Sequence, residues 1–211
     1  MIEAKIHLSP NEMELVTNAE WILTKNGIMV KARWLLENLQ AQMKTYLANN
    51  AGQGDTTVYG SPKISRGENY QGLPYLVLDY PRVFNKSNIL AIRTMFWWGK
   101  FFSTTLHLAG HYKELSERKI VSGVDILKHH NFYLCTNEVE WEHHFETSNY
   151  VPVLDLTQDE FMKLTRGKPF IKIAKKLALH QWNDAGEVLF NNFSLLAGLM
   201  TVNFPGDEKV L

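Results

Sequence analysis

The sequence predicts an α+β fold, built as an antiparallel β-sheet meander flanked by helices. Apolar residues follow helical spacing over the first 50 residues. Over about residues 57–146 the sequence is instead rich in runs of β-branched and aromatic residues, which are typical of strands. Residues typical of helix starts and helix ends occur again after residue 156. This order indicates one domain over residues 1–211. Its expected parts are two N-terminal helices packed as a helical hairpin (1–50), an antiparallel sheet region (57–156) and two or three C-terminal helices (157–211).

The two N-terminal helices are predicted from a start signal and a break. Ser9-Pro10-Asn11-Glu12 joins a capping serine to proline at the first helical position and a glutamate that completes a capping box. Asn26-Gly27 is typical of a left-handed C-cap, so the first helix is expected to end there. A second amphipathic helix is then expected from about residue 28 to 47.

The first strands of the meander lie before residue 81. A short strand is expected at 58–64, where Pro62 restricts it to a sheet edge, and residues 66–69 are expected to turn. Residues 73–80 (LPYLVLDY) are rich in β-forming side chains, and the strand they form is expected to end at Pro81.

The most informative segment is 89–109 (ILAIRTMFWWGKFFSTTLHLA), which predicts a β-hairpin at the centre of the protein. Gly99-Lys100 suits a type II′ turn and would pair Trp98 with Phe101. This register places Arg93 on the face opposite the hydroxyl side chains. A slip of one residue would exchange the two faces, so the assignment depends on the turn type.

Beyond this hairpin, a short polar helix and a connection are expected at 111–128. A second hairpin is expected around Thr136-Asn137, with an acidic, half-buried second strand at 139–145. Three further helices are predicted from residues typical of helix starts and ends. The first begins with a capping box at 157–160 and ends at Gly167, and the second begins at Lys168-Pro169. The last is capped by Asp184 and reaches about residue 202.

Composition excludes several classes of protein. The 22 basic and 22 acidic residues balance, so no net charge favours nucleic acid or a membrane surface. The single cysteine, Cys135, excludes an internal disulfide and a multi-cysteine metal or iron–sulfur site within one chain. No signal peptide or spanning segment is visible, so a cytoplasmic location without membrane partners is expected. No cofactor and no metal are predicted.

The candidate ligand site lies on the central hairpin. Arginine within an apolar sheet needs a carboxylate or a ligand anion, and Asp79 on the neighbouring strand is the expected internal partner of Arg93. The leading hypothesis is a non-catalytic domain that binds a small molecule or a protein partner on the aromatic and hydroxyl face of the hairpin. The candidate binding residues are Arg93, Thr94, Trp98, Ser103, Thr105 and His107.

Two alternatives come from other classes of function. His107 and His111, with a carboxylate such as Glu140, are metal-ligand types and suggest a metal-assisted hydrolase. The basic run 163–176 suggests binding of a polyanion or nucleic acid, although no base-reading motif accompanies it. No nucleophile elbow, phosphate-binding loop or dinucleotide fingerprint occurs, so the sequence favours a role other than catalysis. Exposed aromatic residues leave a homo-oligomer open as well.

Overall fold

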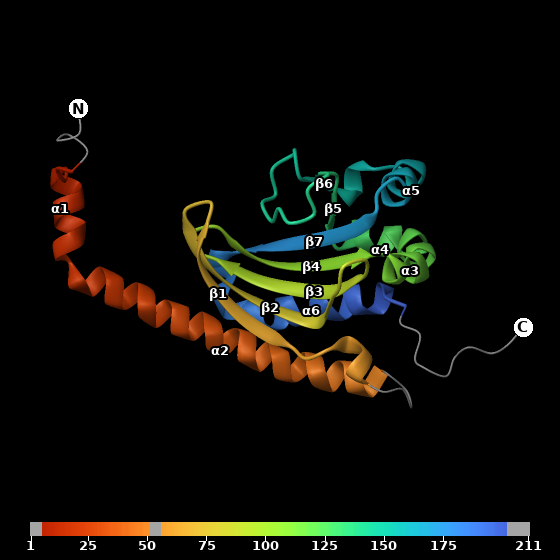
Figure 1. Cartoon of the computed structure of the whole chain (residues 1–211), viewed down its shortest axis with the longest axis horizontal. Coiled ribbons are helices and arrows are strands. Elements are labelled where there is room, and N and C mark those ends of the chain that lie inside the picture. The colour runs from red at the N-terminus through yellow and green to blue at the C-terminus, as the bar shows by residue number, and fades with distance from the viewer. Residues whose placement is uncertain (1–5, 51–55, 202–211) are drawn as a thin grey trace, which may run out of the picture.

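The structure is a computed structural model that describes residues 6–50 and 56–201. It confirms the predicted α+β class, with a seven-stranded antiparallel sheet in the order β1-β2-β3-β4-β7-β5-β6 (Figure 1). The strands are β1 (Lys63–Tyr70), β2 (Leu73–Phe84), β3 (Ile89–Trp97), β4 (Phe101–Ala109), β5 (Tyr133–Cys135), β6 (Tyr150–Pro152) and β7 (Phe170–Ala178). The α-helices are α1 (Pro10–Thr17), α2 (Ala19–Asn50), α3 (His111–Ser122), α4 (Val124–His129), α5 (Gln158–Arg166) and α6 (Ala185–Leu199).

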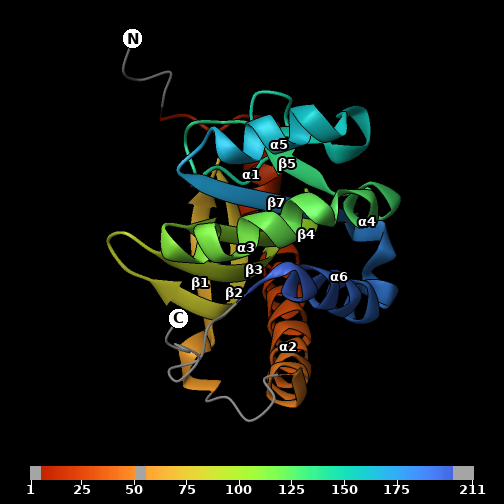
Figure 2. The same cartoon turned by 90° about the vertical axis from the view of Figure 1, so that its right-hand side faces the viewer.

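The two faces of the sheet are covered differently. Helix α2 packs against β1 and β2, and α6 packs against β3, β4 and β7, so both lie on one face (Figures 1 and 2). The main apolar core lies between these helices and the sheet, and Phe96, Phe102 and Leu106 are almost fully buried in it. The opposite face is covered by the irregular segment 136–149 between β5 and β6, which we call the covering loop. Among the described residues, no helix is long and apolar enough to span a membrane.

The predicted capping boxes are present, whereas the predicted break at Gly27 is wrong. Ser9 and Glu12 cap α1, and Thr157 and Glu160 cap α5. The first helix instead ends at Thr17, with Asn18 as its C-cap, and α2 continues as one 32-residue helix through Gly27. Packing of the buried side of α2 against the sheet and α6 outweighs the roughly 1 kcal/mol that glycine costs inside a helix.

The first strand lies later in the chain than predicted, and the second begins at residue 73 as predicted but ends later. Residues 66–69, expected to turn, belong to β1, and the chain turns at Gln71-Gly72, where both residues have positive φ. Strand β2 continues past Pro81 to Phe84, because a register shift between Asp79 and Arg82 accommodates the proline.

The register of the central hairpin differs by one residue from the type II′ prediction. Trp97, not Trp98, pairs with Phe101, and the three residues Trp98-Gly99-Lys100 form the turn, with φ +69° at Gly99. Because side chains alternate along a strand, this shift exchanges the predicted faces. Arg93 is now paired with Thr105, on the same face as Ser103 and His107.

Two segments change type relative to the prediction. Residues 139–145 form no strand. They belong to the covering loop, and β5 pairs instead with β6 and β7. The residues after Lys168-Pro169, expected to begin a helix, form strand β7, which lies between β4 and β5. Helix α6 begins after Asp184 as predicted, although the Asp184 side chain makes no capping hydrogen bond. It ends at Leu199, and its predicted end at about residue 202 lies outside the described part.

Candidate functional site

The sheet face beneath the covering loop carries a cluster of charged and titratable side chains. Cross-strand pairing sets two adjacent rows, because side chains directly opposite one another in antiparallel strands share a face. One row runs from Asp79 through Arg93 to Thr105, and the next contains His107 beside Lys172. Glu140 and His143 of the covering loop complete the group. We call Asp79, Arg93, His107, Glu140, His143 and Lys172 the polar cluster.

Arg93 is paired internally, as the sequence suggested. Its Nε donates to Asp79 Oδ1 at 2.7 Å and its Nη2 donates to Oδ2 at 2.9 Å, which is a bidentate ion pair. Its Nη1 lies 3.1 Å from Nε2 of His143. Arginine can only donate, so His143 accepts through Nε2 and carries its proton on Nδ1. Burial, with the positive charges of Lys172 and Arg93, holds the pKa of His143 well below its usual value.

Two residues of the sheet, Lys172 and Tyr70, bind the backbone of the covering loop. The Nζ of Lys172 donates to the backbone oxygens of Glu140, at 2.9 Å, and of Glu142. The hydroxyl of Tyr70 accepts from the backbone nitrogens of His143, at 2.7 Å, and His144, at 3.2 Å, and it donates to the Glu142 carboxylate at 2.9 Å. Burial lowers the pKa of Lys172 to about 8, so the ammonium form that makes these bonds prevails at neutral pH.

Removing the Tyr70 hydroxyl is therefore expected to loosen the covering loop. In Tyr70→Phe two loop N–H groups lose their acceptor, which should cost about 1–3 kcal/mol of unfolding free energy. Limited proteolysis should cut within 136–149 faster than in the wild type. Tyr75→Phe removes a hydroxyl from the ring packed edge-on against Tyr70 and is the matched control. Equal cutting rates in the two variants would show that Tyr70 does not fasten the loop.

The contact between His107 and Glu140 joins the sheet to the loop. Nε2 of His107 lies 3.0 Å from Oε2 of Glu140. Burial first, and then the charges of Lys172 and Arg93, lower the pKa of His107 to about 3, so the ring is neutral at physiological pH. A neutral ring next to a carboxylate donates its N–H, which places the proton on Nε2. The Glu140 side chain is 27 % exposed, and the ring to which it is hydrogen-bonded is neutral.

A cavity of about 360 Å³ opens beside this carboxylate. One wall comes from the loop between β2 and β3 and includes Lys86, and the other comes from the covering loop and includes Glu138 and Glu140. Apolar side chains that include Ile89 and Phe170 line the rest. The ring of Phe170 also lies edge-on to His107, with ring centroids 5.8 Å apart, so the cavity adjoins the polar cluster directly.

The six predicted binding residues divide between three places. Arg93, Ser103, Thr105 and His107 share the loop-covered face. Thr94 lies on the helix-covered face, fully buried, where its hydroxyl has no hydrogen-bond partner among the described residues. Trp98 lies in the hairpin turn and lines a second cavity, of about 400 Å³, together with Trp21 and Ile28 of α2. Arg93 and Thr94 are consecutive on β3, so they face opposite sides in either register, and the shift instead brings Ser103, Thr105 and His107 to the face of Arg93.

The residues of the two alternative hypotheses are arranged differently from the prediction. The structure brings Glu140 to His107, but within residues 6–50 and 56–201 no three histidine, cysteine, aspartate or glutamate side chains converge on a metal position. His111 begins α3 as an exposed residue.

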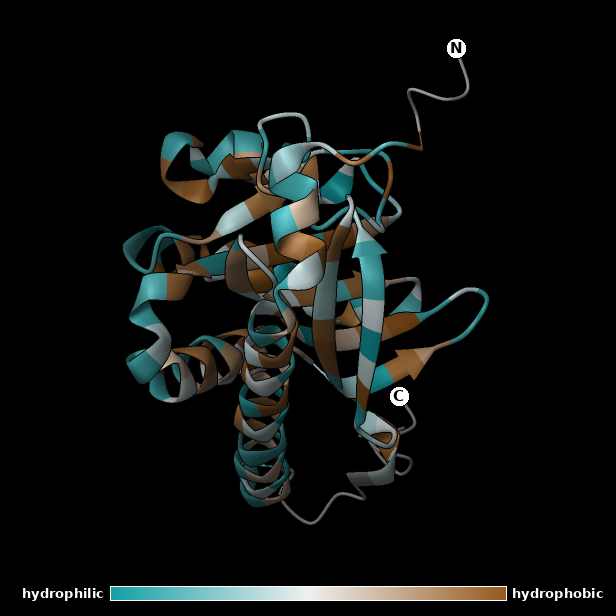
Figure 3. Cartoon of the chain, turned by 90° about the vertical axis from the view of Figure 1, so that its left-hand side faces the viewer, coloured by the Kyte–Doolittle hydropathy of each residue, from teal (hydrophilic) through white to brown (hydrophobic). Residues whose placement is uncertain are grey.

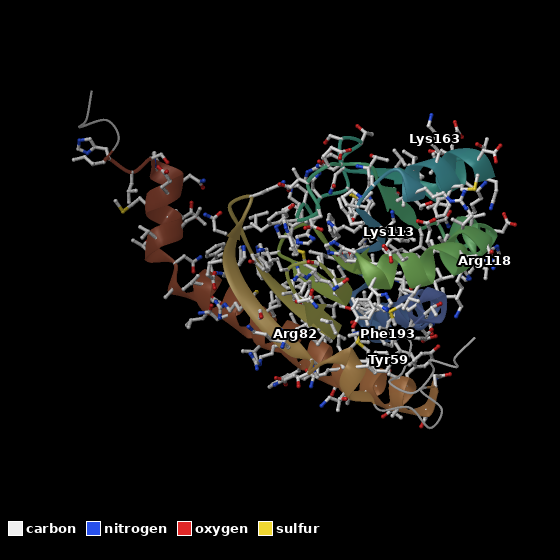
Figure 4. All side chains as sticks on the ribbon, turned by 45° about the vertical axis from the view of Figure 1, so that its right-hand side comes forward. Tyr59, Arg82, Lys113, Arg118, Lys163 and Phe193 are labelled. Carbon is white, nitrogen blue, oxygen red and sulfur yellow. The ribbon has the colours of Figure 1, made fainter. Side chains whose placement is uncertain are left out.

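The basic run 163–176 is divided rather than continuous. Lys172 is buried under the loop, and Lys175 lies over the ring of Phe132 on the other face of β7. Lys163 lies on α5, and Lys113 and Arg118 lie on α3, which packs against α5 (Figure 4). Glu117 lies 3.6 Å from Lys113 and so balances charge at this end of the molecule.

The single cysteine, Cys135, is not activated as a nucleophile. Burial raises the pKa of the Cys135 thiol, which lies 3.5 Å from Oδ1 of the buried Asn149. The acids and bases of the cluster bind one another or the backbone of the covering loop. This arrangement holds the loop and presents one carboxylate to a cavity.

No known relative decides the function. In comparisons with known proteins, no family model, no curated protein and no solved structure matches this chain. The contacts of the chain itself therefore carry the functional argument.

The sequence analysis associates Glu140 with His107 only in the metal hypothesis, and it misses the roles of His143 and Lys172. Glu140 and His143 were placed in a strand, and Lys172 in a helix, where no pairing rule connects them to Arg93 or His107. One usable signal was the alternation of lysine with apolar residues in 170–178 (FIKIAKKLA), because Ile171 and Ile173 flank Lys172 at period two, as strand residues do.

Proposed function

We propose that the protein is a non-catalytic binding protein for a small organic amine, which it holds in the cavity beside Glu140. The observation that carries this proposal is a partly buried carboxylate whose side-chain partner is a neutral histidine. An anion in such a place gains from a cationic ligand, because desolvated charges are stabilised by an opposite charge in hydrogen-bond contact.

His107 acts as a positioning residue in this proposal. Its ring is held between Phe170 and Trp141, with centroid distances of 5.8 and 5.4 Å, and its N–H fixes one oxygen of Glu140. A fixed carboxylate loses little side-chain entropy when a ligand binds. The second oxygen is then available to accept hydrogen bonds from an ammonium group.

The remaining lining defines the size and polarity of the ligand. A cavity of about 360 Å³ lies at the small end of ligand sites and suits a molecule of amino-acid size. Ile89, Ala109 and Phe170 offer apolar surface for the body of the ligand. Lys86 on the facing wall would favour a ligand that also bears a carboxylate, so an apolar amino acid fits the lining as well as a simple amine does.

The test uses three probes that share one ring: phenethylamine, phenylalanine and 3-phenylpropanoate. Isothermal titration calorimetry should detect binding of the two amines and not of the acid. In Glu140→Gln the affinity for both amines should fall about tenfold or more, as expected for the loss of a charge-assisted hydrogen bond. Glu146→Gln removes an exposed charge from the same loop, away from the cavity lining, and should bind as the wild type does.

Three outcomes contradict the proposal. These are no binding of either amine at millimolar concentration, equal affinity for all three probes, and unchanged affinity in Glu140→Gln. Comparing phenylalanine with phenethylamine assigns the contribution of Lys86, because only the amino acid carries the carboxylate that it would contact.

A further inference from the structure

Residues 6–34 form an arm that projects from the sheet and exposes its apolar side chains. The arm comprises α1 and the first half of α2, and it extends beyond β1 at the end of the molecule opposite α3 and α5 (Figure 1). Coloured by hydropathy, its helices show apolar segments among polar ones (Figure 3). The exposed large hydrophobic residues of the arm are Ile6, Leu8, Met13, Leu15, Val16, Trp21, Ile22, Leu23, Val30 and Trp34.

Helix α2 has an exposed stripe opposite its buried face. The buried side is formed by Met29, Ala32 and Leu36 with later residues at the same spacing. Leu23, Gly27, Val30 and Trp34 follow one another at spacings of four, three and four, which places them on one line along the helix. The three large side chains of this stripe are 67 %, 47 % and 59 % exposed, in sequence order. Such spacing is typical of a helix that pairs with a second helix.

Within one copy of the chain, no contact explains why residue 27 is glycine. It lies inside a helix, where glycine costs about 1 kcal/mol relative to alanine. A Cβ placed on it would meet no atom within 4 Å. A glycine in the middle of an apolar stripe allows the backbone of another helix to approach closely.

Helix α1 also lacks a surface to pack on. It has eight residues, and none of them is buried in the described structure. A helix this short is marginal in water unless packing supports it, even with a capping box. Its apolar residues Met13 and Val16 are 50 % and 68 % exposed. In the described structure, the exposed apolar side chains of the arm therefore have no surface of the same chain to pack against.

The charges along the arm favour a second copy of this chain as the partner. Residues 6–24 contain three glutamates and no lysine or arginine, whereas residues 25–44 contain four basic residues and one glutamate. In an antiparallel pair the acidic half of each copy lies along the basic half of the other, and the apolar stripe pairs with itself. The acidic tip argues against a membrane surface, because helices that lie on membranes are rich in lysine and arginine.

The arm as a whole exposes an area comparable with that of a stable interface. An aromatic side chain contributes roughly 150–250 Å² and the aliphatic ones less, and the ten exposed apolar residues, about half exposed, together present on the order of 1,000 Å² over the several faces of the arm. A standard interface needs about 800 Å² from each partner.

We infer that the protein is a homodimer in which the arms of two copies cross antiparallel near Gly27 and bury the Leu23–Val30–Trp34 stripe. This interface is separate from the cavity beside Glu140, so the two proposals succeed or fail independently.

Sedimentation velocity between 1 and 100 µM tests the inference, with matched substitutions of leucine. The wild type should sediment as a dimer. Leu23→Glu should weaken the dimer about tenfold or more, because a charge replaces an apolar contact at the crossing. Leu154→Glu is the control, since Leu154 is 60 % exposed and lies outside the arm, and it should sediment as the wild type does. Both sites are exposed, so the folds of the two variants should give the same circular dichroism spectrum.

A second variant separates close packing from general hydrophobic association. Gly27→Leu improves helix propensity and adds apolar surface, yet it should dissociate the dimer, because the added side chain holds the crossing helices apart. Stronger association in Gly27→Leu would overturn the crossing near Gly27. A wild type that is monomeric at 100 µM would overturn the dimer, as would a wild type that remains monomeric and sediments with vesicles of 30 % phosphatidylserine.

Discussion

Replacing Asp79 with alanine is expected to destabilise the folded protein by about 3 kcal/mol or more. Asp79 is the bidentate partner of Arg93, and the two side chains are 9 % and 22 % exposed. Removing one member of a buried pair leaves an uncompensated charge, which typically costs about 3–5 kcal/mol. Partial access of water to Arg93 places the expected value toward the lower end. The midpoint of urea unfolding, measured with an unchanged m-value, checks it.

The double variant Asp79→Ala, Arg93→Met tests whether the charge itself is the cause. With the guanidinium also removed, no unpaired charge remains, so much of the lost stability should return. Glu37→Ala, which breaks the exposed Arg33–Glu37 pair on α2, should cost no more than about 0.5 kcal/mol. If the double variant is as unstable as the sum of its single variants, then packing rather than the ion pair explains the loss at Asp79.

Local rules predicted the ends of several elements because the relevant interactions lie within a few residues. The capping boxes at Ser9 and Thr157 satisfy backbone N–H groups three residues away, so the sequence contains both partners. Gly27 failed as a stop signal for the opposite reason. The contacts that carry α2 past it come from the sheet and α6, far away in the sequence.

The prediction of the candidate site depended on the register of the central hairpin, which differs by one residue between the predicted and the observed turn. A two-residue turn and a three-residue turn can both use glycine with positive φ, and the aromatic pairs Trp97-Trp98 and Phe101-Phe102 look alike in either register. Choosing the shorter turn separated Arg93 from Thr105, which the structure places side by side. The correct register makes the polar residues of one face neighbours, although Arg93 is satisfied by Asp79 rather than by a ligand.

The covering loop could not be predicted from periodicity. Residues 139–145 alternate apolar and polar side chains as a half-buried strand does, yet they make side-chain and backbone contacts with the sheet face instead of strand pairing. The distant groups Tyr70 and Lys172 bind the backbone there, and each is more than 25 residues away in the sequence. A single sequence contains no sign of such long-range partners. The strand pattern therefore placed Glu140 on a solvent-facing side, apart from the metal hypothesis, and His143 on the apolar side of the same strand.

Low pH is expected to destabilise the fold by protonating the two buried histidines of the polar cluster, His107 and His143. His107 has a pKa of about 3 in the folded protein against 6.5 for an ordinary histidine, and the pKa of His143 is lowered in the same direction. The unfolded chain therefore binds more protons than the folded chain below pH 6.5, and stability falls as the pH decreases from 6.5 toward 3. At pH 5 His107 alone should cost about 2 kcal/mol relative to pH 7.5, and His143 adds to this loss.

Protonation of His143 would remove its hydrogen bond with Arg93. Protonated His143 could no longer accept from Arg93 Nη1, and it would place two positive groups 3.1 Å apart with Lys172 close by. Urea unfolding at pH 7.5, 6 and 5 should show the loss. His107→Gln combined with His143→Gln should reduce it strongly, while His111→Gln controls for replacing an exposed histidine. Titration of either buried ring near pH 6.5 in NMR spectra would contradict this account. In that case the covering loop would be open enough to admit water to the polar cluster, and Glu140 would have a cationic partner before any amine arrived.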